Sequence, residues 1–327
     1  MNTMRGKAVS VGLALLALFA TPVAAQQKVA QQAGARSALY SQDAFDPALE
    51  QQLRAIVAQG RGRIGVHAVE LDSGRHAAIN ADQAFPMAST VKIAIAAAYL
   101  KGVDEGRLRL DSEYPLRMST GRTGGDGRVI TRAGMSLTAQ SLIELMITKS
   151  DNQATDALLA AVGGPGVVNA WLTSAGIHGQ RVDRDIATLL RDDLERNDPV
   201  LGRDRRDTST PAAMVQLLTA LYRGDVLSPA SRGVLLGAMS RCRTGKTRIP
   251  ALLPAGTLVA HKTGTLWSQT SDVGIIRLPD GRSVALAVFV TGPESHAVHG
   301  RQIATIARTV YDAFTAGSYQ PSTTVRR

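Results

Sequence analysis

Strand-forming segments lie at both ends of the 327-residue chain, and a long helical block lies between them. Two alternating runs over residues 63–85, joined around Asp72-Ser73-Gly74, predict a β-hairpin. Three further strand patterns lie between residues 256 and 292, whereas residues 89–239 have mostly helical periodicity with glycines after several helices. Because one sheet can bury both sets of strands, we expect an α/β fold in which an antiparallel sheet carries an inserted all-helical domain.

Helical patterns at residues 46–59 and 300–314 flank the strands, so we expect these terminal helices to cover the sheet. The pattern divides the chain into segments with different roles. The predicted boundaries are 26–44 for a polar lead-in, 45–88 and 240–315 for the sheet domain, 89–239 for the helical domain and 316–327 for a polar tail.

Residues 1–25 are typical of a secretory signal peptide. Arg5 and Lys7 precede a short apolar run, and the small residues Val23-Ala24-Ala25 suit a cleavage site. The run is shorter than the ~20 residues that a spanning helix needs. We therefore expect cleavage near Ala25, a secreted or periplasmic location and no stable membrane anchor.

The formal net charge is +10, which raises the question of a nucleic-acid partner. The basic residues are interleaved with acids, aromatics make up only 4% of the chain, and no nucleic-acid motif is present. The single cysteine, Cys242, cannot form an internal disulfide. We expect no nucleic-acid partner, and we expect a monomer.

Ser89 and Lys92 stand three residues apart at the start of a predicted helix, in the segment "FPMASTVKIAIAAA". This spacing places both side chains on one face of the helix. A serine hydroxyl becomes a useful nucleophile when a neighbouring base takes its proton, and a lysine with a lowered pKa can be that base. Taken alone, however, the S-x-x-K pattern is weak and is also typical of an ordinary helix start.

Two further motifs strengthen the case for nucleophilic catalysis. Ser150-Asp151-Asn152 follows in "KSDNQ", and Lys262-Thr263-Gly264 follows in "HKTGT". S-x-x-K, S-D-N and K-T-G in this order are the signature set of class A β-lactamases and penicillin-binding proteins. The chain resembles class A serine β-lactamases from about residue 45 to residue 315, including "DTSTPAAM" and "SDVGIIRLPDG".

The resemblance implies a function as well as a fold. The family fold is an α/β sandwich with an inserted helical domain and the active site between the two. The implied activity is that of an exported serine β-lactamase, which hydrolyses the amide of a small-molecule β-lactam through an acyl-enzyme on Ser89. No cofactor and no metal are expected.

The resemblance also implies roles for individual residues. Ser89 resembles the acylated nucleophile, Lys92 the base or proton relay, and Ser150 the hydroxyl that protonates the leaving nitrogen. Asn152 resembles the side chain that holds the acylamino group of the substrate. Asp151 more closely resembles a brace for its loop than a reacting group.

The implied substrate-binding residues lie on the K-T-G segment and beside it. Lys262 and Thr263 resemble the groups that bind the substrate carboxylate, and the backbone N–H groups of Ser89 and Thr265 resemble an oxyanion hole. Family members support carboxylate binding with an arginine from one of two positions. Those positions hold Val273 and Arg248 here, so Arg248 is expected to supply the charge.

One part of the family pattern is broken. The glutamate that activates the deacylating water falls on Ile186, and its asparagine companion falls on Leu190, when residues are counted without gaps from Ser150. Allowing an insertion makes Glu195 the expected base; Asp185, another acid of this loop, or no base at all are the alternatives. Arg184 and Asp207 resemble the ion pair that joins the two ends of the loop.

This break leaves other functions open. A related D,D-peptidase or esterase would use the same acylation machinery on another substrate. A slow-deacylating penicillin-binding sensor would be acylated and then stall. His261 next to Lys262 either lines the site or shapes its strand, and His296 and His299 are interpreted as part of a loop that leads into the last helix.

Overall fold

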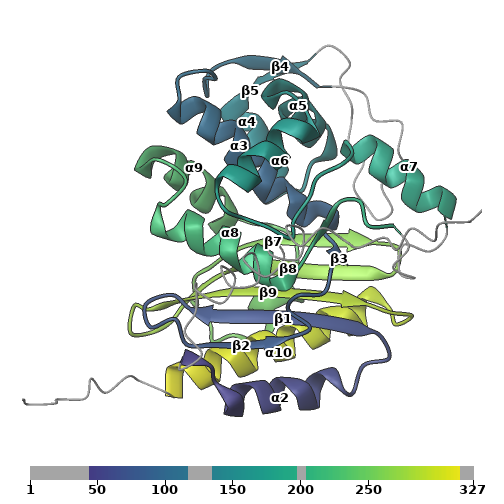
Figure 1. The fold of residues 1–327 in the computed structure, drawn as a ribbon, viewed down its shortest axis with the longest axis vertical. Helices are drawn as coiled ribbons and strands as arrows, with labels where there is room; N and C mark the ends of the chain where they lie inside the picture. The colour runs from purple at the N-terminus through teal and green to yellow at the C-terminus, as the bar shows by residue number, and fades with distance from the viewer. Residues whose placement is uncertain (1–43, 117–134, 197–203, 317–327) are drawn as a thin grey trace, which may run out of the picture. The chain divides into compact units, whose positions relative to one another are not determined.

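The computed structural model describes residues 44–116, 135–196 and 204–316. Its central element is a five-stranded sheet with the order β2-β1-β9-β8-β7, in which all neighbouring strands are antiparallel (Figure 1). Because β1 from the beginning of the chain pairs with β9 from its end, the expected fold class is confirmed. The strands are β1 (Arg63–Glu70), β2 (His76–Ile79), β7 (Val259–Leu266), β8 (Gln269–Arg277) and β9 (Ser283–Thr291).

Both terminal helices, α2 (Pro47–Val57) and α10 (His296–Ala316), pack on one face of the sheet, as expected. Asp46 begins α2 by accepting a hydrogen bond from the backbone N–H of Leu49, and Pro47 fits the first helical turn. Leu53 and Phe314 are fully buried in the core between the helices and the sheet. Truncation of such a side chain to alanine typically costs about 2–5 kcal/mol of stability.

The opposite face of the sheet is covered by α8 (Pro211–Arg223), which contacts β1, β8 and β9. Thr210 begins this helix by accepting a hydrogen bond from the N–H of Ala213, and Gly224 ends it in the left-handed conformation with φ of 84°. The following helix, α9 (Pro229–Ser240), contacts β7 and links the sheet to the helical block.

The helical block is organised around α3 (Lys92–Asp104), in which every residue from Lys92 to Leu100 is buried. A helix that is apolar on all sides requires neighbours on all sides, and α4, α5, α6 and α9 supply them. In Figure 1 these helices lie beyond β7, the edge strand of the sheet. The remaining helices are η2 (Ala88–Val91), α4 (Ala139–Thr148), α5 (Asn152–Val162), α6 (Pro165–Ser174), α7 (Ile186–Arg196) and η4 (Ile249–Leu252).

Two short two-stranded sheets complete the described structure. β3 (Phe85–Pro86) pairs with β6 (Thr208–Ser209), and β4 (Glu113–Pro115) pairs with β5 (Ser136–Thr138). β3 is followed closely in the chain by η2, which contains Ser89, the nucleophile expected from the sequence.

The predicted signal peptide, the lead-in up to residue 43 and the tail from residue 317 lie outside the described residues. Within the described part of the chain, no single helix is both long and apolar enough to cross a membrane. The bent pair of α5 and α6 passes the same test of length and composition when the two helices are taken together. In α5 most residues are buried, and in α6 the buried residues are Val168, Trp171 and Leu172.

Candidate active site

Ser89 lies in η2, the short turn that follows β3 and precedes α3. The residue before it, Ala88, has a φ of 48°, which is uncommon for a residue with a side chain. Such strained conformations occur frequently at functional sites, where the surrounding structure holds them. The half-buried serine is therefore held in a fixed turn at the N-terminus of the central helix.

Lys92 is the first residue of α3, and its side chain is fully buried. Its Nζ donates hydrogen bonds to the backbone oxygen of Ser150 at 2.7 Å, to the Ser150 hydroxyl at 3.2 Å and to Oδ1 of Asn152 at 2.6 Å. Burial and the nearby Lys262 lower the pKa of Lys92 well below its usual value, although Asp151 and Asp156 oppose this shift. A lysine in this state can hold a neutral amine, which is the form that accepts a proton.

Ser150 lies between the two lysines of the motifs. Lys262 Nζ donates to its hydroxyl at 3.0 Å and also to the backbone oxygen of Thr263 at 2.9 Å. Ser150 has a φ of 58°, so it too occupies the left-handed region. The hydroxyl is thus within hydrogen-bond reach of Nζ of both lysines and can pass a proton between them.

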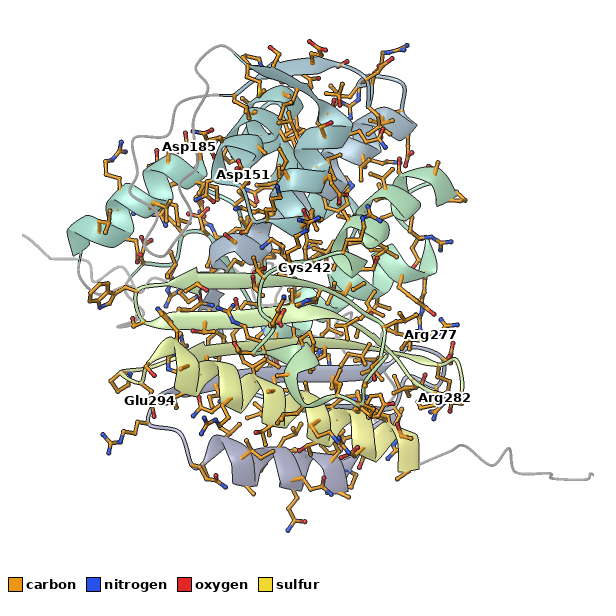
Figure 2. All side chains as sticks on the ribbon, turned by 180° about the vertical axis from the view of Figure 1, so that it is seen from behind. Asp151, Asp185, Cys242, Arg277, Arg282 and Glu294 are labelled. Atoms are coloured by element: carbon orange, nitrogen blue, oxygen red, sulfur yellow. The ribbon has the colours of Figure 1, made fainter. Side chains whose placement is uncertain are left out.

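Asp151 begins α5, because its Oδ1 accepts a hydrogen bond from the backbone N–H of Ala154 at 2.8 Å. Figure 2 labels this residue at the start of its helix. Asp151 therefore braces the segment that carries Ser150 and Asn152. This hydrogen bond agrees with the structural role that the resemblance implies for Asp151.

The K-T-G segment lies on β7, where Lys262 is fully buried and Thr263 nearly so. Burial lowers the pKa of Lys262 to about 8, against the opposing effects of Cys242 and Asp272. A side chain at Gly264 would collide with the backbone oxygen of Met87 at 2.6 Å and with the Ser271 hydroxyl at 2.5 Å. Glycine at this position therefore allows β7 to approach the segment that carries the nucleophile.

Arg248 reaches the same strand from the loop before η4. Its guanidinium donates to the backbone oxygen of Gly264 at 2.9 Å and to the hydroxyl of Thr265 at 2.7 Å. It also contacts the backbone oxygen of Ser271 at 2.8 Å. Val273, the alternative position, is buried and apolar, so the structure brings the charge to the K-T-G segment from Arg248.

A row of polar side chains that contact one another next to Thr263 was not predicted from the sequence. The hydroxyl groups of Thr244 and Thr263 lie 2.6 Å apart, and Sγ of Cys242 lies 3.3 Å from the Thr244 hydroxyl. Figure 2 shows Cys242 at the edge of the sheet nearest the helical elements. Thr244 lies 19 residues before Thr263 in a loop without a motif, so the sequence gives no signal for this contact.

His261 shapes the strand and is paired inside the protein. Its Nδ1 lies 2.8 Å from Oδ1 of Asp272 on β8, and both side chains are buried. Burial alone would lower the pKa of His261, but Asp272 outweighs this effect and raises it to about 10. Near neutral pH the pair is therefore an imidazolium and a carboxylate that join β7 to β8.

The other histidines that the sequence singles out lie in the first turns of α10, so they belong to the helix itself. Nδ1 of His296 and Nδ1 of His299 lie 2.9 Å and 3.3 Å from the hydroxyl of Thr270. Within residues 44–116, 135–196 and 204–316, no group of three or more potential metal ligands comes together. The two rings are thus part of the packing between α10 and β8.

Arg184 and Asp207 join the ends of the charged segment 182–207, as the resemblance implies. Nε of Arg184 donates to Oδ2 of Asp207 at 2.6 Å, and the N–H groups of Asp183 and Arg184 donate to Oδ1 of the same carboxylate. Arg184 also contacts Asp192 and Asp204. Asp192, Asp204 and Asp207 are therefore paired with arginines of this segment.

The charged segment contains a helix, α7, that the sequence analysis did not identify. Asp156 on α5 holds its first turn, because its carboxylate accepts hydrogen bonds from the N–H groups of Ile186 at 2.7 Å and Ala187 at 3.1 Å. Burial raises the pKa of Asp156 to about 6, although these two hydrogen bonds oppose the shift. Asp156 follows Asn152 by four residues, a spacing that could have placed it on the same face of α5.

The face of α7 that approaches the nucleophile is apolar. Leu189 and Leu190 pack against Ala88, which precedes Ser89, and against Leu266 at the end of β7. Ile186 is only 3% exposed. The position on which the ungapped count places the glutamate therefore holds a buried apolar side chain.

The family can be established by comparison with known proteins. Residues 48–314 match the model of the Beta-lactamase enzyme family. This chain belongs to the β-lactamase enzyme family. The expectation of a hydrolase that acts on the β-lactam amide is thereby confirmed, and the likeness to known proteins extends to the whole described fold.

The extended-spectrum beta-lactamase PER-1 of Pseudomonas aeruginosa is 30% identical over 282 residues, which cover 83% of this chain and 89% of that protein. The ancestral class A β-lactamase of Gram-negative bacteria has a TM-score of 0.71 at 36% identity, over 81% of this chain and 100% of that chain. A Leu-to-Glu variant of PBP-A, solved as an acyl-enzyme complex with penicillin G, has a TM-score of 0.74 at 29% identity. That match covers 83% of this chain and 98% of the variant.

A β-lactamase that completes its reaction needs a base for the deacylating water. Asp185 is exposed, and its carboxylate accepts a hydrogen bond from the N–H of Thr188 at the start of α7 (Figure 2). Position 195 lies in the last turn of α7, and the Glu195 side chain lies outside the described residues. At about 100° per residue, this position is on the opposite side of the helix from Ile186.

Asp193 is the carboxylate on the side of α7 that carries Leu189 and Leu190. Its Oδ2 accepts a hydrogen bond from the backbone N–H of Trp267 at 3.4 Å. Its Oδ1 is buried and has no partner among the described residues, and burial raises its pKa. From the sequence, Asp193 was only one of several acids of this loop that could be the base.

Proposed function

We propose that the protein is an exported serine β-lactamase that opens β-lactams by acylation of Ser89. The observation that carries the proposal is the placement of Ser150 between Lys92 and Lys262, directly beside the turn that holds the serine. Acylation requires a base for the serine hydroxyl, and Lys92 is a buried amine with a lowered pKa. It also requires positive charge for the substrate, which Lys262 supplies from β7. Membership of the β-lactamase family supports the same reaction.

In this proposal, Oγ of Ser89 forms a bond to the carbonyl carbon of the lactam while neutral Lys92 takes the hydroxyl proton. The carbon–nitrogen bond of the ring then breaks. The nitrogen receives the proton through Ser150, which lies within hydrogen-bond reach of Lys92. The backbone N–H groups of Ser89 and Thr265 would stabilise the oxyanion that forms on the carbonyl oxygen.

The substrate carboxylate would be held by Lys262, Thr263 and Arg248. Lys262 and Arg248 supply positive charge at the two ends of the K-T-G segment, and Thr263 and Thr265 supply hydroxyl groups. Asn152 would hold the acylamino group of the substrate, since its Oδ1 is already fixed by Lys92. These contacts orient the lactam carbonyl toward Ser89.

In deacylation, a base takes a proton from water as the water oxygen bonds to the ester carbon. The bond from that carbon to Oγ of Ser89 then breaks, and Oγ receives the proton. We propose that α7 supplies the base for this step. Asp193 is favoured by its position on the side of α7 that faces Ala88 and Leu266, and by its raised pKa. Glu195, the residue expected from the sequence, is the competing candidate.

A second candidate function, an acylated protein that stalls, is favoured by the apolar contact of Leu189 and Leu190 with Ala88. An apolar surface next to the ester would exclude the ordered water that deacylation needs. The protein would then be a slow-deacylating penicillin-binding protein. Its likeness to PBP-A supports this possibility.

The proposed export can be tested separately. Expression of the full chain in a Gram-negative host, followed by fractionation and intact-mass analysis, should give a periplasmic protein that begins near Gln26. Recovery of a full-length protein from the cytoplasm or the membrane would contradict the proposal.

The function is tested by mixing the purified protein with a chromogenic cephalosporin and following absorbance and intact mass together. A β-lactamase gives sustained hydrolysis, whereas a stalled protein gives one turnover and a lasting adduct. In the Ser89→Ala variant, both the adduct and the hydrolysis should be lost. Turnover of peptides ending in D-Ala-D-Ala without any lactam turnover would instead identify a D,D-peptidase.

A further inference from the structure

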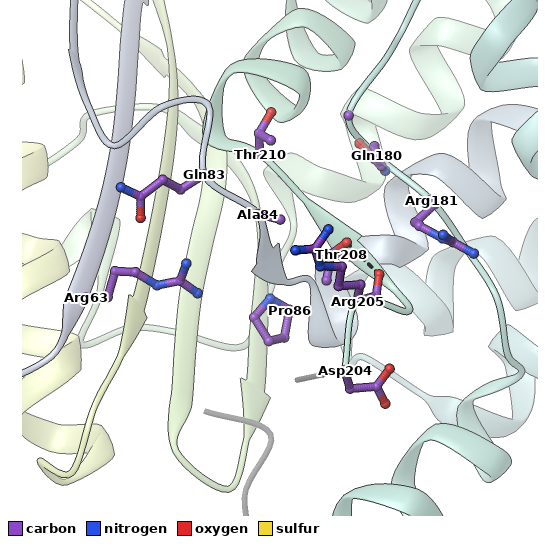
Figure 3. A pocket seen from close by; sticks show the side chains of 11 residues that line it. Arg63, Gln83, Ala84, Pro86, Gln180, Arg181, Asp204, Arg205, Thr208 and Thr210 are labelled. Atoms are coloured by element: carbon purple, nitrogen blue, oxygen red, sulfur yellow. Dashed lines mark hydrogen bonds between the residues drawn. The ribbon is translucent and has the colours of Figure 1, made fainter. Parts of the chain in front are cut away.

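A cavity lies beside the β3–β6 pair and is lined by residues other than those of the candidate active site (Figure 3). Its volume is about 650 Å³, which is within the range of small-molecule sites. None of the motif residues that surround Ser89 lines it. The lining residues that bear on ligand binding are Arg63, Arg205, Gln180, Arg181 and Asp204.

Two arginines supply uncompensated positive charge to this cavity. Arg63 is half-buried, its guanidinium lies 4.2 Å from the centre of the Phe85 ring, and burial lowers its pKa. Arg205 is exposed at the other side of the cavity. Among the described residues, neither guanidinium has a carboxylate partner. Figure 3 shows the two groups pointing toward each other from either side of Ala84 and Pro86.

The other charged residues of the cavity are already neutralised. Arg181 pairs with Asp183 through two of its nitrogens. Asp204 accepts hydrogen bonds from Arg206 and Arg184. The charge that remains available is therefore that of Arg63 and Arg205.

Gln180 provides an independent indication of a ligand. Its side chain is only 8% exposed, and its Oε1 accepts a hydrogen bond from the Ser209 hydroxyl at 3.4 Å. Its Nε2 is buried and has no acceptor among the described residues. A buried donor without an acceptor is unfavourable, so an oxygen atom placed at this end of the cavity would stabilise it.

We propose that this cavity binds a small oxyanion, either a carboxylate or a phosphate, between Arg63 and Arg205. A guanidinium offers two parallel N–H donors that match the oxygens of either group. Gln180, whose buried Nε2 has no acceptor among the described residues, lies at the wall of the same cavity. The site is distinct from the substrate site at Lys262 and does not depend on the β-lactamase activity.

The test is titration calorimetry of the whole purified protein with inorganic phosphate and, separately, with citrate. Binding of one probe but not the other identifies the preferred oxyanion. Arg205→Gln is the primary variant because Arg205 is exposed and its replacement leaves the core intact. We expect it to weaken binding at least tenfold, and Arg63→Gln/Arg205→Gln to abolish it.

Arg301→Gln is the matched control, since Arg301 is also an exposed arginine but lies on α10 and does not line the cavity. It should bind the probes within twofold of the wild type. The rate of Ser89 acylation, measured in parallel, should be unchanged in Arg205→Gln. Equal binding in the wild type and the Arg205→Gln variant would place the anion elsewhere, for example at Lys262 and Arg248, and would overturn the proposal, as would no binding of either probe to the wild type.

Discussion

The ammonium group of Lys262 donates a hydrogen bond to the hydroxyl of Ser150 at a distance of 3.0 Å. This contact joins the K-T-G strand of the sheet to the S-D-N turn of the helical block. Because Lys92 approaches the same hydroxyl at 3.2 Å, the protonation of either lysine affects the other. The pH dependence of acylation should therefore report on this pair.

The first prediction concerns Lys262, whose pKa is lowered to about 8 by burial. Its charge attracts the substrate carboxylate, so kcat/KM for acylation should fall several-fold as the pH rises from 7 to 9. Lys262→Arg keeps a positive charge at pH 9, so the fall should move to higher pH even if the maximum is reduced. A pH profile with the same alkaline limb in both proteins would contradict this role.

The second prediction concerns Asp156, whose folded pKa is raised to about 6 from an ordinary value of 3.8. A raised carboxyl pKa stabilises the fold below the unfolded pKa, and this contribution is lost as the pH rises through the folded pKa. Between pH 4 and pH 7 the wild type should lose up to about 3 kcal/mol relative to Asp156→Asn. Urea unfolding at each pH measures the difference.

The matched control for this experiment is Asp185→Asn, because Asp185 also contacts the first turn of α7 but is exposed. Its stability should follow the wild type across the same pH range. Parallel pH curves for Asp156→Asn and the wild type would show that the carboxyl group titrates normally.

The third prediction concerns the buried pair of His261 and Asp272. His261→Ala would leave the fully buried Asp272 carboxylate with the backbone N–H of Ile249 at 3.1 Å as its remaining partner. Removing one member of a buried ion pair typically costs about 3–5 kcal/mol, so Tm should fall markedly at pH 7.

His178→Ala, a change at an exposed histidine, should shift stability by no more than about 0.5 kcal/mol. The folded pKa of His261 is raised, so the contribution of the pair is complete below the unfolded pKa. It is lost as the pH rises through about 10. Equal melting temperatures for the His261 variant and the wild type would mean that the pair does not support β7.

The fourth prediction compares the two acids of α7. We expect Asp193→Asn to prolong the Ser89 acyl-enzyme at least tenfold without slowing its formation, because Asp193 lies on the side of α7 that faces Ala88 and Leu266. Glu195→Gln should behave as the wild type. The opposite result would restore Glu195 as the base, and unchanged lifetimes in both variants would favour the stalled protein. Single-turnover kinetics with mass detection separates these outcomes.

The sequence could predict much of the fold and of the acylation site for a physical reason. Ser89, Lys92 and Asn152 lie at helix starts, where short-range spacing determines which side chains share a face. Alternation of apolar residues likewise indicated β1 and β2, and a run of strand-forming residues indicated β9. Each motif consists of a few neighbouring residues, so it can be recognised in the sequence without knowledge of the fold.

The region around α7 could not be predicted in the same way. Its charges suggested a loop, but Leu189 and Leu190 form an apolar surface that packs against Ala88 and Leu266. The hydrogen bonds from its first turn to Asp156 span 30 residues of sequence. Such contacts depend on how α5 and β7 are placed in space, which spacing along the chain does not encode.

The most direct test of the account is an intact-mass time course of the wild type and the Ser89→Ala variant with benzylpenicillin. In samples quenched while penicillin remains, the wild type should gain the mass of one intact penicillin. Peptide mapping should place this adduct on Ser89, and the variant should gain nothing. An adduct on another residue, or undiminished lactam hydrolysis by Ser89→Ala, would contradict it.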